Sequence, residues 1–290
     1  MKQILALLLC LVFAGSGFAQ QDSVSRYDNH KVFDPTFFTF NGNEFRSASG
    51  APGPKYWQNR ADYEIHASLN EKDSLLVGKV SIEYTNNSPD TLHYLWVQLD
   101  QNLFRDSSRG ALTTPISGDR FDVRGYDKGG YHIEKVSVVY KGKSYRIEPV
   151  ITDTRMQIRL PFAIHPGGDK VNLTVDYQFS IPVYGADRMG RLRTKNGQVY
   201  ELAQWYPRMC VYDDIDGWNT MPYMGLGEFY LEYGDFNYYV TVPSDMVVVG
   251  SGDLINGAEV LTPDERRKLQ EAYRSDKTIS IIGSKDLGKR

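Results

Sequence analysis

Cysteine, excess positive charge and long apolar runs are all scarce in this sequence, and each scarcity excludes a class of protein. The 290 residues carry 33 Lys and Arg against 36 Asp and Glu. No positive excess is available to neutralise the phosphates of a nucleic acid, so no nucleic-acid partner is expected. Beyond the first residues, no apolar stretch reaches the roughly 20 residues that a transmembrane helix needs. No fixed-period repeat and no low-complexity tract occurs.

The first 19 residues have the pattern of a signal peptide. A short positive region precedes an apolar run from Ile4 to Phe13, and Gly17-Phe18-Ala19 supplies the small residues that a signal peptidase requires. We therefore expect a mature chain that begins at Gln20 and is exported to the periplasm or the extracellular space. No transmembrane segment is expected after signal cleavage.

The sequence contains two cysteines, Cys10 and Cys210. Lipidation at Cys10 is the alternative to cleavage, but Leu7-Leu8-Leu9 lacks the small residues that usually precede a lipidated cysteine. After cleavage only Cys210 remains, and a lone cysteine forms no internal disulfide. No His lies close to Cys210 in the sequence, so a buried structural thiol is favoured over a nucleophile.

Most of the chain alternates apolar and polar residues with a period of two. Gly-, Asn- and Pro-rich turns separate these runs, as in an antiparallel sheet with one buried face. The pattern predicts a mainly β fold, an antiparallel β-sandwich or saddle-like set of sheets, with one short C-terminal helix. The runs centre on residues 63–69, 76–84, 95–99, 156–160 (ending at Pro161), 171–179, 238–242 and 246–249.

The segment after residue 258 has a different pattern. Thr262-Pro263-Asp264-Glu265 is a capping box with Pro at the first helical position, which predicts a helix continuing through Arg274. Lys277 to Ile282 has the composition of a short strand. The predicted organisation is therefore a signal peptide (1–19), a polar extension (20–55) that includes Phe37, Phe38 and Phe40, a β domain (56–258), and a final helix and strand (259–290).

The sequence contains no complete catalytic or metal-binding motif. The five His are scattered and none begins the H-E-x-x-H pattern of zinc hydrolases. Asp213-Asp214-Ile215-Asp216-Gly217 is similar to part of a calcium loop but lacks its spaced acids and closing Glu. A solvated acidic turn is favoured there, and calcium binding is left open. No metal ligand and no catalytic residue is predicted.

The densest aromatic segment runs from Tyr200 to Trp218, and here the sequence resembles the N-terminal domain of bacterial aminopeptidase N-type zinc metallopeptidases. The resemblance extends from Tyr56 to Ile282 and includes the strand order around Gly78-Lys79-Val80 and Leu95 to Leu99. The segments that carry it most clearly are Gln204 to Met209, Tyr212 to Asp214, Gly217-Trp218, Gly227 to Tyr230, Tyr233 to Phe236, Val240 to Pro243 and Val249 to Gly252.

The resemblance implies a substrate-anchoring role. In that family a saddle of β-strands precedes a thermolysin-like catalytic domain, and a Gln or Glu on a strand edge binds the free α-amine of the peptide substrate. Gln204 matches that position best, and Glu201 is the second choice. Trp205, Tyr206 and Arg208 are expected to line the same substrate-binding surface.

The resemblance also implies zinc in the full-length family but no cofactor in this chain, because its zinc motif and its G-x-M-E-N strand are absent here. We therefore expect no peptidase activity from the chain alone. Because the sequence ends soon after the predicted saddle, we expect a catalytic domain in cis or in trans, and apolar surface exposed where that domain would pack. The alternative is a non-catalytic secreted β-sandwich module that binds a peptide, glycan or protein partner.

Overall fold

The computed structural model describes residues 42–113, 129–183, 188–195, 197–227, 229–284 and 286. The expected signal peptide and Phe37, Phe38 and Phe40 lie outside these residues. The chain divides into two compact units, residues 1–56 and 57–290. In the described part of the first unit, Arg46 and Pro52 form an isolated antiparallel bridge. Among the described residues, no helix is long and apolar enough to cross a membrane.

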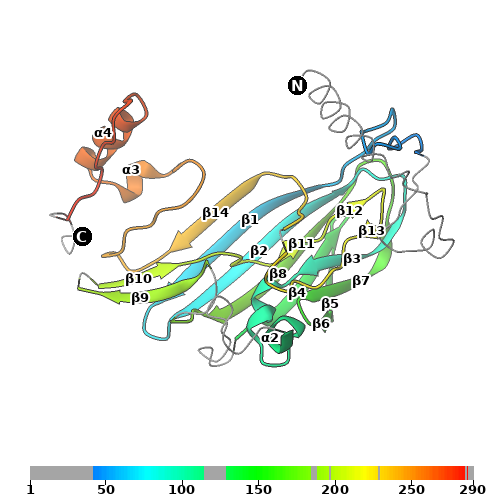
Figure 1. The fold of residues 1–290 in the computed structure, drawn as a ribbon, viewed down its shortest axis with the longest axis horizontal. Coiled ribbons are helices and arrows are strands. Elements are labelled where there is room, and N and C mark those ends of the chain that lie inside the picture. Colours follow the sequence, from blue (N-terminus) through cyan, green and yellow to red (C-terminus); the bar gives the residue numbers. More distant parts are fainter. Residues whose placement is uncertain are drawn as a thin grey trace, which may run out of the picture. The chain divides into compact units, whose positions relative to one another are not determined.

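A six-stranded sheet forms the larger part of the second unit, with its strands side by side in the order β14-β1-β2-β8-β4-β5 (Figure 1). Along β1, β2 and β8 buried and solvent-facing side chains alternate almost without interruption, because successive side chains of a strand point to opposite faces. The strands are β1 (Arg60–Asn70), β2 (Leu75–Asn86), β4 (His132–Tyr140), β5 (Lys143–Ile147), β8 (Asp169–Ser180) and β14 (Phe236–Thr241).

A smaller sheet has the order β11-β3-β7-β6, and two short hairpins form separate two-stranded sheets. Its strands are β3 (Leu92–Gln98), β6 (Val150–Thr152), β7 (Arg155–Ile164) and β11 (Arg208–Met209). The hairpins pair β9 (Gly190–Thr194) with β10 (Gly197–Glu201), and β12 (Tyr212–Asp213) with β13 (Gly217–Trp218). The helical elements are the 3₁₀ helix η3 (Asp100–Phe104), α2 (Arg109–Thr113), α3 (Gly257–Val260) and α4 (Pro263–Ala272).

The inner faces of the two sheets share one hydrophobic core. Ile65, Val80 and Leu173 from the large sheet belong to the same buried cluster as Val97 and Ile158 from the small sheet. The two sheets are also joined by a hydrogen bond, because the backbone N–H of Met209 donates to the Tyr63 hydroxyl at 2.9 Å. The second unit is therefore a β-sandwich stabilised mainly by burial of apolar surface.

The predicted mainly β fold is confirmed. The predicted alternating runs in β1, β2, β3, β7 and β8 place most of their apolar members in the core, and Leu69 and Leu160 pack against it partly buried. The capping box of α4 is also present: the Thr262 hydroxyl accepts from the Glu265 N–H at 3.3 Å, and Glu265 Oε2 accepts from the Thr262 N–H at 2.8 Å.

Four details of the structure differ from the prediction. β14 pairs parallel to β1, a local departure from the predicted antiparallel pairing. β7 does not stop at Pro161 but continues to Ile164, and it tolerates the proline because the pairing with β3 is irregular there and β6 pairs only with residues 155–157. Residues 246–249 and 277–282 form no strand, because neither segment has a neighbouring strand with which to pair.

Candidate functional site

The segment that joins β10 to β11 carries the residues predicted to bind substrate. Glu201 is the last residue of β10, and Arg208 is the first residue of β11. Gln204, Trp205 and Tyr206 lie between them, outside any strand. The expectation that Gln204 lies on a strand edge is therefore wrong, since its backbone leaves the extended region.

Gln204 has a left-handed backbone conformation, with φ of 48°. Its carbonyl oxygen accepts two hydrogen bonds, from Gln101 Nε2 at 3.0 Å and from the Tyr131 hydroxyl at 2.8 Å. Gln101 Nε2 also lies 3.2 Å from the Ala203 carbonyl oxygen. Within the part of the chain that the structure describes, the Gln204 side-chain amide has no hydrogen-bond partner, and the residue is half-buried. The Gln204 side-chain amide is therefore available for a ligand, and the backbone that carries it is held in place by two hydrogen bonds.

The two donors come from elements that the sequence did not single out. Gln101 lies in η3, which directly follows β3, and its side chain is buried. Tyr131 is also buried, and its backbone N–H donates to Asn102 Oδ1 at 2.9 Å. The signal that could have found them is Asp100-Gln101-Asn102, three polar residues immediately after a strand whose inner face is apolar.

Arg208 forms a buried ion pair with Asp100. Its Nε and Nη2 atoms both donate to Asp100 Oδ2, at 2.8 and 2.5 Å, and the two side chains are only 7% and 1% exposed. The guanidinium also lies 4.3 Å from the centroid of the Phe229 ring. Because these donors face a buried carboxylate, Arg208 holds β11 to η3, and its expected place on a substrate-binding surface stays a prediction.

Trp205 and Tyr206 lie against aromatic side chains of the large sheet. The Trp205 ring meets the Tyr238 ring edge to face at 6.3 Å, and Tyr206 meets Tyr63 and Phe236 at 5.7 and 6.1 Å. Both residues are half-buried. The two aromatic residues therefore seat the segment on β1 and β14, while part of each ring faces solvent beside Gln204.

Glu201 ends the β9–β10 hairpin and is exposed, opposite Gly190. No ion pair or hydrogen bond of its side chain occurs among the described residues. The structure thus places Glu201 at the end of the paired strand β10 and Gln204 in the connection that follows, where hydrogen bonds to its carbonyl oxygen hold its backbone.

The acidic turn at Asp213–Asp216 joins β12 to β13. Asp213 Oδ1 accepts from the backbone N–H groups of Ile215 and Asp216, and Oδ2 accepts from the Tyr230 hydroxyl at 3.0 Å. Both oxygens of Asp213 therefore have protein partners. Close by, Glu232 is buried, and its Oε1 accepts from the Tyr212 N–H at 3.1 Å. Burial and, to a smaller extent, the charge of Asp213 raise the pKa of Glu232 to about 7.

The described residues offer no group of side chains suited to a zinc ion. In the described ranges, no three His, Cys, Asp or Glu side chains are grouped so that they could hold a metal ion. Cys210 is buried, with Sγ 3.9 Å from Gln98 Oε1. Burial raises the pKa of its thiol to about 12, which suppresses the reactive thiolate. This environment agrees with the prediction that Cys210 is a buried structural thiol.

Comparison with known proteins gives only distant structural matches. The M1 zinc metallopeptidase from Deinococcus radiodurans has a TM-score of 0.33 and 14% sequence identity over 67% of this chain and 35% of its own. A mutant of that enzyme bound to a Tyr-Ser-Ala substrate has a TM-score of 0.32, also with 14% identity, over 67% of this chain and 35% of its own. A two-domain M1 zinc metallopeptidase mutant bound to L-arginine has a TM-score of 0.27 and 14% identity, over 45% of this chain and 22% of its own. No family model and no curated protein matches the sequence.

These likenesses assign no function to the chain. They have low TM-scores and low identity, and the chain spans only 22–35% of the length of the structures it matches. Any activity, substrate or partner of the whole proteins is therefore a matter for proposal.

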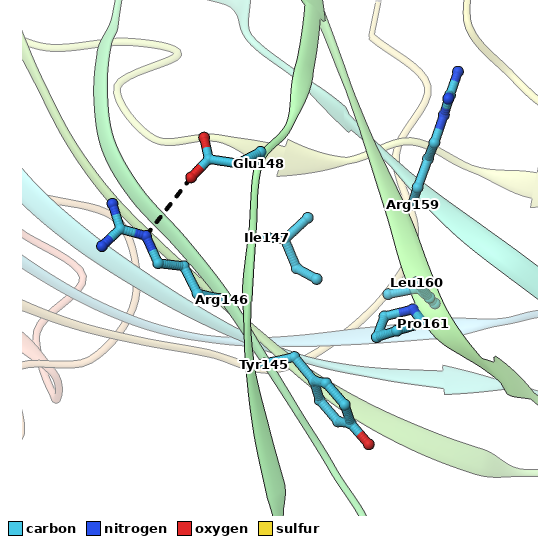
Figure 2. Close-up of a pocket in the computed structure, with 7 residues that line it drawn as sticks. All are labelled: Tyr145, Arg146, Ile147, Glu148, Arg159, Leu160 and Pro161. Carbon is cyan, nitrogen blue, oxygen red and sulfur yellow. Dashed lines mark ion pairs between the residues drawn. The ribbon is translucent and has the colours of Figure 1, made fainter.

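A surface depression lies elsewhere, between the edge strand β5 and β7 (Figure 2). Figure 2 shows Arg146 and Glu148 paired across 3.7 Å, with the Arg159 side chain extending away from Leu160 and Pro161. None of the residues predicted to bind substrate lines it. The lining residues are Tyr145, Arg146, Ile147, Glu148, Arg159, Leu160 and Pro161.

Proposed function

We propose that the second unit is the substrate-anchoring β domain of an exported zinc aminopeptidase, and that Gln204 binds the free α-amine of a peptide. The observation that carries this proposal is the unpartnered side-chain amide of Gln204 on a backbone fixed by Gln101 and Tyr131. The resemblance of residues 204–209 to the substrate-anchoring segment of that peptidase family supports the same role.

The chemistry of an amide suits an ammonium ligand. The amide oxygen accepts hydrogen bonds from an ammonium group without forming an ion pair. A hydrogen bond to a charged partner is stronger than one between neutral groups, with a net value of about 1.5–3 kcal/mol. Because the backbone of Gln204 is already fixed, ligand binding has to order only its side chain. The exposed carboxylate of Glu201 adds negative charge to the same connection.

The exposed apolar residues after β13 support a protein partner. Tyr233, Val249 and Ile255 are 77%, 89% and 87% exposed. Exposed apolar side chains are expected where a catalytic domain would pack, since protein interfaces cover such side chains. We propose that these residues contact a thermolysin-like catalytic domain, in cis or in trans, which would supply the zinc and the chemistry.

Gln204→Ala should weaken binding of a free amine by about tenfold, because it removes one hydrogen bond to a charged group. The measurement is an NMR titration of the intact chain with leucinamide, and N-acetyl-leucinamide is the comparison ligand. We expect leucinamide to bind more tightly than the acetylated compound, and Gln204→Ala to abolish that preference.

The matched control for this prediction is Gln198→Ala, a half-buried glutamine on β10 whose Nε2 lies 3.4 Å from the Val199 carbonyl oxygen. It should leave both affinities unchanged. Equal binding of the two ligands to the wild-type chain, or an unchanged preference in Gln204→Ala, would refute the amine-binding role.

The chain alone should release no amino acid from amide reporter substrates, even with added zinc, because its sequence lacks the residues that bind and activate a zinc-bound water. The assay compares added zinc with a chelator. Turnover that disappears with the chelator would mean that the chain contains a metal site after all. If turnover is absent, adding a thermolysin-like catalytic domain should restore it, and Gln204→Ala should lower the restored rate.

A further inference from the structure

The backbone of Gln204 is held in a conformation that glutamine does not favour. A φ of 48° lies in the left-handed region, where a side chain other than glycine costs about 1 kcal/mol or more. Such a conformation persists only where the surrounding structure imposes it. The contacts that impose it here can be named, because the Gln204 carbonyl oxygen accepts from two buried side chains.

Three consecutive residues of η3 hold both ends of the segment 203–208. Asp100 accepts the two hydrogen bonds of Arg208 at the far end. Gln101 donates to the carbonyl oxygens of Ala203 and Gln204 at the near end. Asn102 Oδ1 fixes the backbone of Tyr131, whose hydroxyl completes the contacts to Gln204.

We infer that Gln101 and Tyr131 are positioning residues for peptide N-terminus recognition, acting through the backbone of Gln204. This inference rests on the function proposed for Gln204. Neither residue meets the ligand, since both side chains are buried beneath the segment. Without their two hydrogen bonds, residue 204 relaxes towards an ordinary backbone conformation, and its amide turns away from the position where it meets an amine.

The chain provides a closely matched control in Tyr177. This tyrosine is buried like Tyr131, and the two rings meet edge to face at 5.4 Å. The Tyr177 hydroxyl, however, has no hydrogen-bond partner among the described residues. Tyr177→Phe therefore removes a buried hydroxyl from the same aromatic layer without removing a contact to Gln204.

The experiment uses Tyr131→Phe, Gln101→Met and Tyr177→Phe in the intact chain. The first measurement needs no ligand: the backbone chemical shifts and the three-bond HN–Hα coupling of residue 204 report its φ. Tyr131→Phe and Gln101→Met should move these values away from those of the left-handed conformation, whereas Tyr177→Phe should not. If residue 204 stays left-handed when both Tyr131 and Gln101 are replaced together, the inference is overturned whatever the binding data show.

The second measurement is the preference for leucinamide over N-acetyl-leucinamide. Tyr131→Phe should reduce this preference three- to tenfold and leave the affinity for the acetylated compound unchanged. In a Gln204→Ala background the same substitution should have no further effect, because it acts through that amide. A further loss in that background would contradict positioning.

The two proposals fail in different ways. If Gln204→Ala abolishes the preference but Tyr131→Phe and Gln101→Met do not reduce it, the positioning inference is wrong and the function proposed for Gln204 survives. If Gln204→Ala leaves the preference intact, the proposed function fails, and the role of the two residues in recognition fails with it.

Discussion

Arg208→Met should lower the free energy of unfolding by about 3–5 kcal/mol at neutral pH. The substitution removes the partner of Asp100, a carboxylate whose side chain is 1% exposed, and an unpaired buried charge costs about this much. Burial raises the pKa of Asp100, and Arg208 is the main group that opposes the rise. Chemical denaturation at pH 7 measures the loss.

The pH dependence of this loss has a definite sign. Without Arg208, the pKa of Asp100 in the folded state rises further above that of the unfolded chain, so the folded state binds the proton more tightly. The deficit of Arg208→Met should therefore shrink as the pH falls. The double variant Asp100→Leu/Arg208→Met should recover most of the stability, since apolar residues can replace a buried ion pair at little cost. A single variant as stable as the wild type would show that the pair is not buried.

Glu232→Gln should stabilise the chain at pH 8 by about 3 kcal/mol and have little effect at pH 4.5. Burial of Glu232 raises its pKa from the ordinary value of 4.5 to about 7, and the difference corresponds to about 3 kcal/mol. Glutamine keeps an oxygen that can accept from the Tyr212 N–H, so the hydrogen bond of Oε1 is retained. The measurement is the free energy of unfolding between pH 4.5 and pH 8.

The sign follows from the direction of the shift. Because the folded state holds the Glu232 proton more tightly than the unfolded state, the stability associated with this proton is complete below the unfolded pKa. This stabilisation disappears as the pH rises through about 7, because Glu232 then loses its proton in the folded state as well. The wild type should therefore lose stability across this window, and Glu232→Gln should show a flatter profile.

The control for Glu232 is Glu134→Gln, which changes an exposed glutamate on β4. It should follow the wild-type profile. If Glu232→Gln is no more stable than the wild type at pH 8, then the Glu232 carboxyl is hydrated in the folded state, contrary to its burial.

Strand alternation made much of the fold predictable. Val80, Ile82 and Leu173 are buried because a period of two puts them on one face, and local sequence carries that information. The α4 cap was predictable for the same reason, since Thr262 and Glu265 act within a single turn.

The pairing of β14 could not be read in this way. The alternation of β14 does not show whether it runs parallel or antiparallel to β1, because that direction depends on the path of the chain between the two strands. Residues 236–241 also lie mostly exposed at the sheet edge, so burial gives little further information. The prediction of a strand at 277–282 was wrong for a related reason. A strand forms only beside another strand, and amino-acid composition does not show whether one is present.

The sequence singled out Gln204 and Arg208 as candidates but could not show the contacts that each one makes. Gln204 and Arg208 lie four positions apart in one aromatic segment. The side-chain amide of Gln204 has no partner among the described residues, whereas the guanidinium of Arg208 pairs with Asp100. Gln101 and Tyr131 lie 103 and 73 residues from Gln204 in the chain, so no local pattern links them to it.

The parallel pairing of β14 with β1 also has a consequence for folding kinetics. Its register joins Tyr63 to Phe236, so this edge of the sheet closes a loop that includes almost all of the sandwich. Such non-local pairing is slow, because the entropy of loop closure is lost before the contacts form. During synthesis, the edge of β1 that pairs with β14 therefore stays unpaired until residue 236 and its neighbours emerge. We expect the chain to be most prone to edge-to-edge aggregation in this interval.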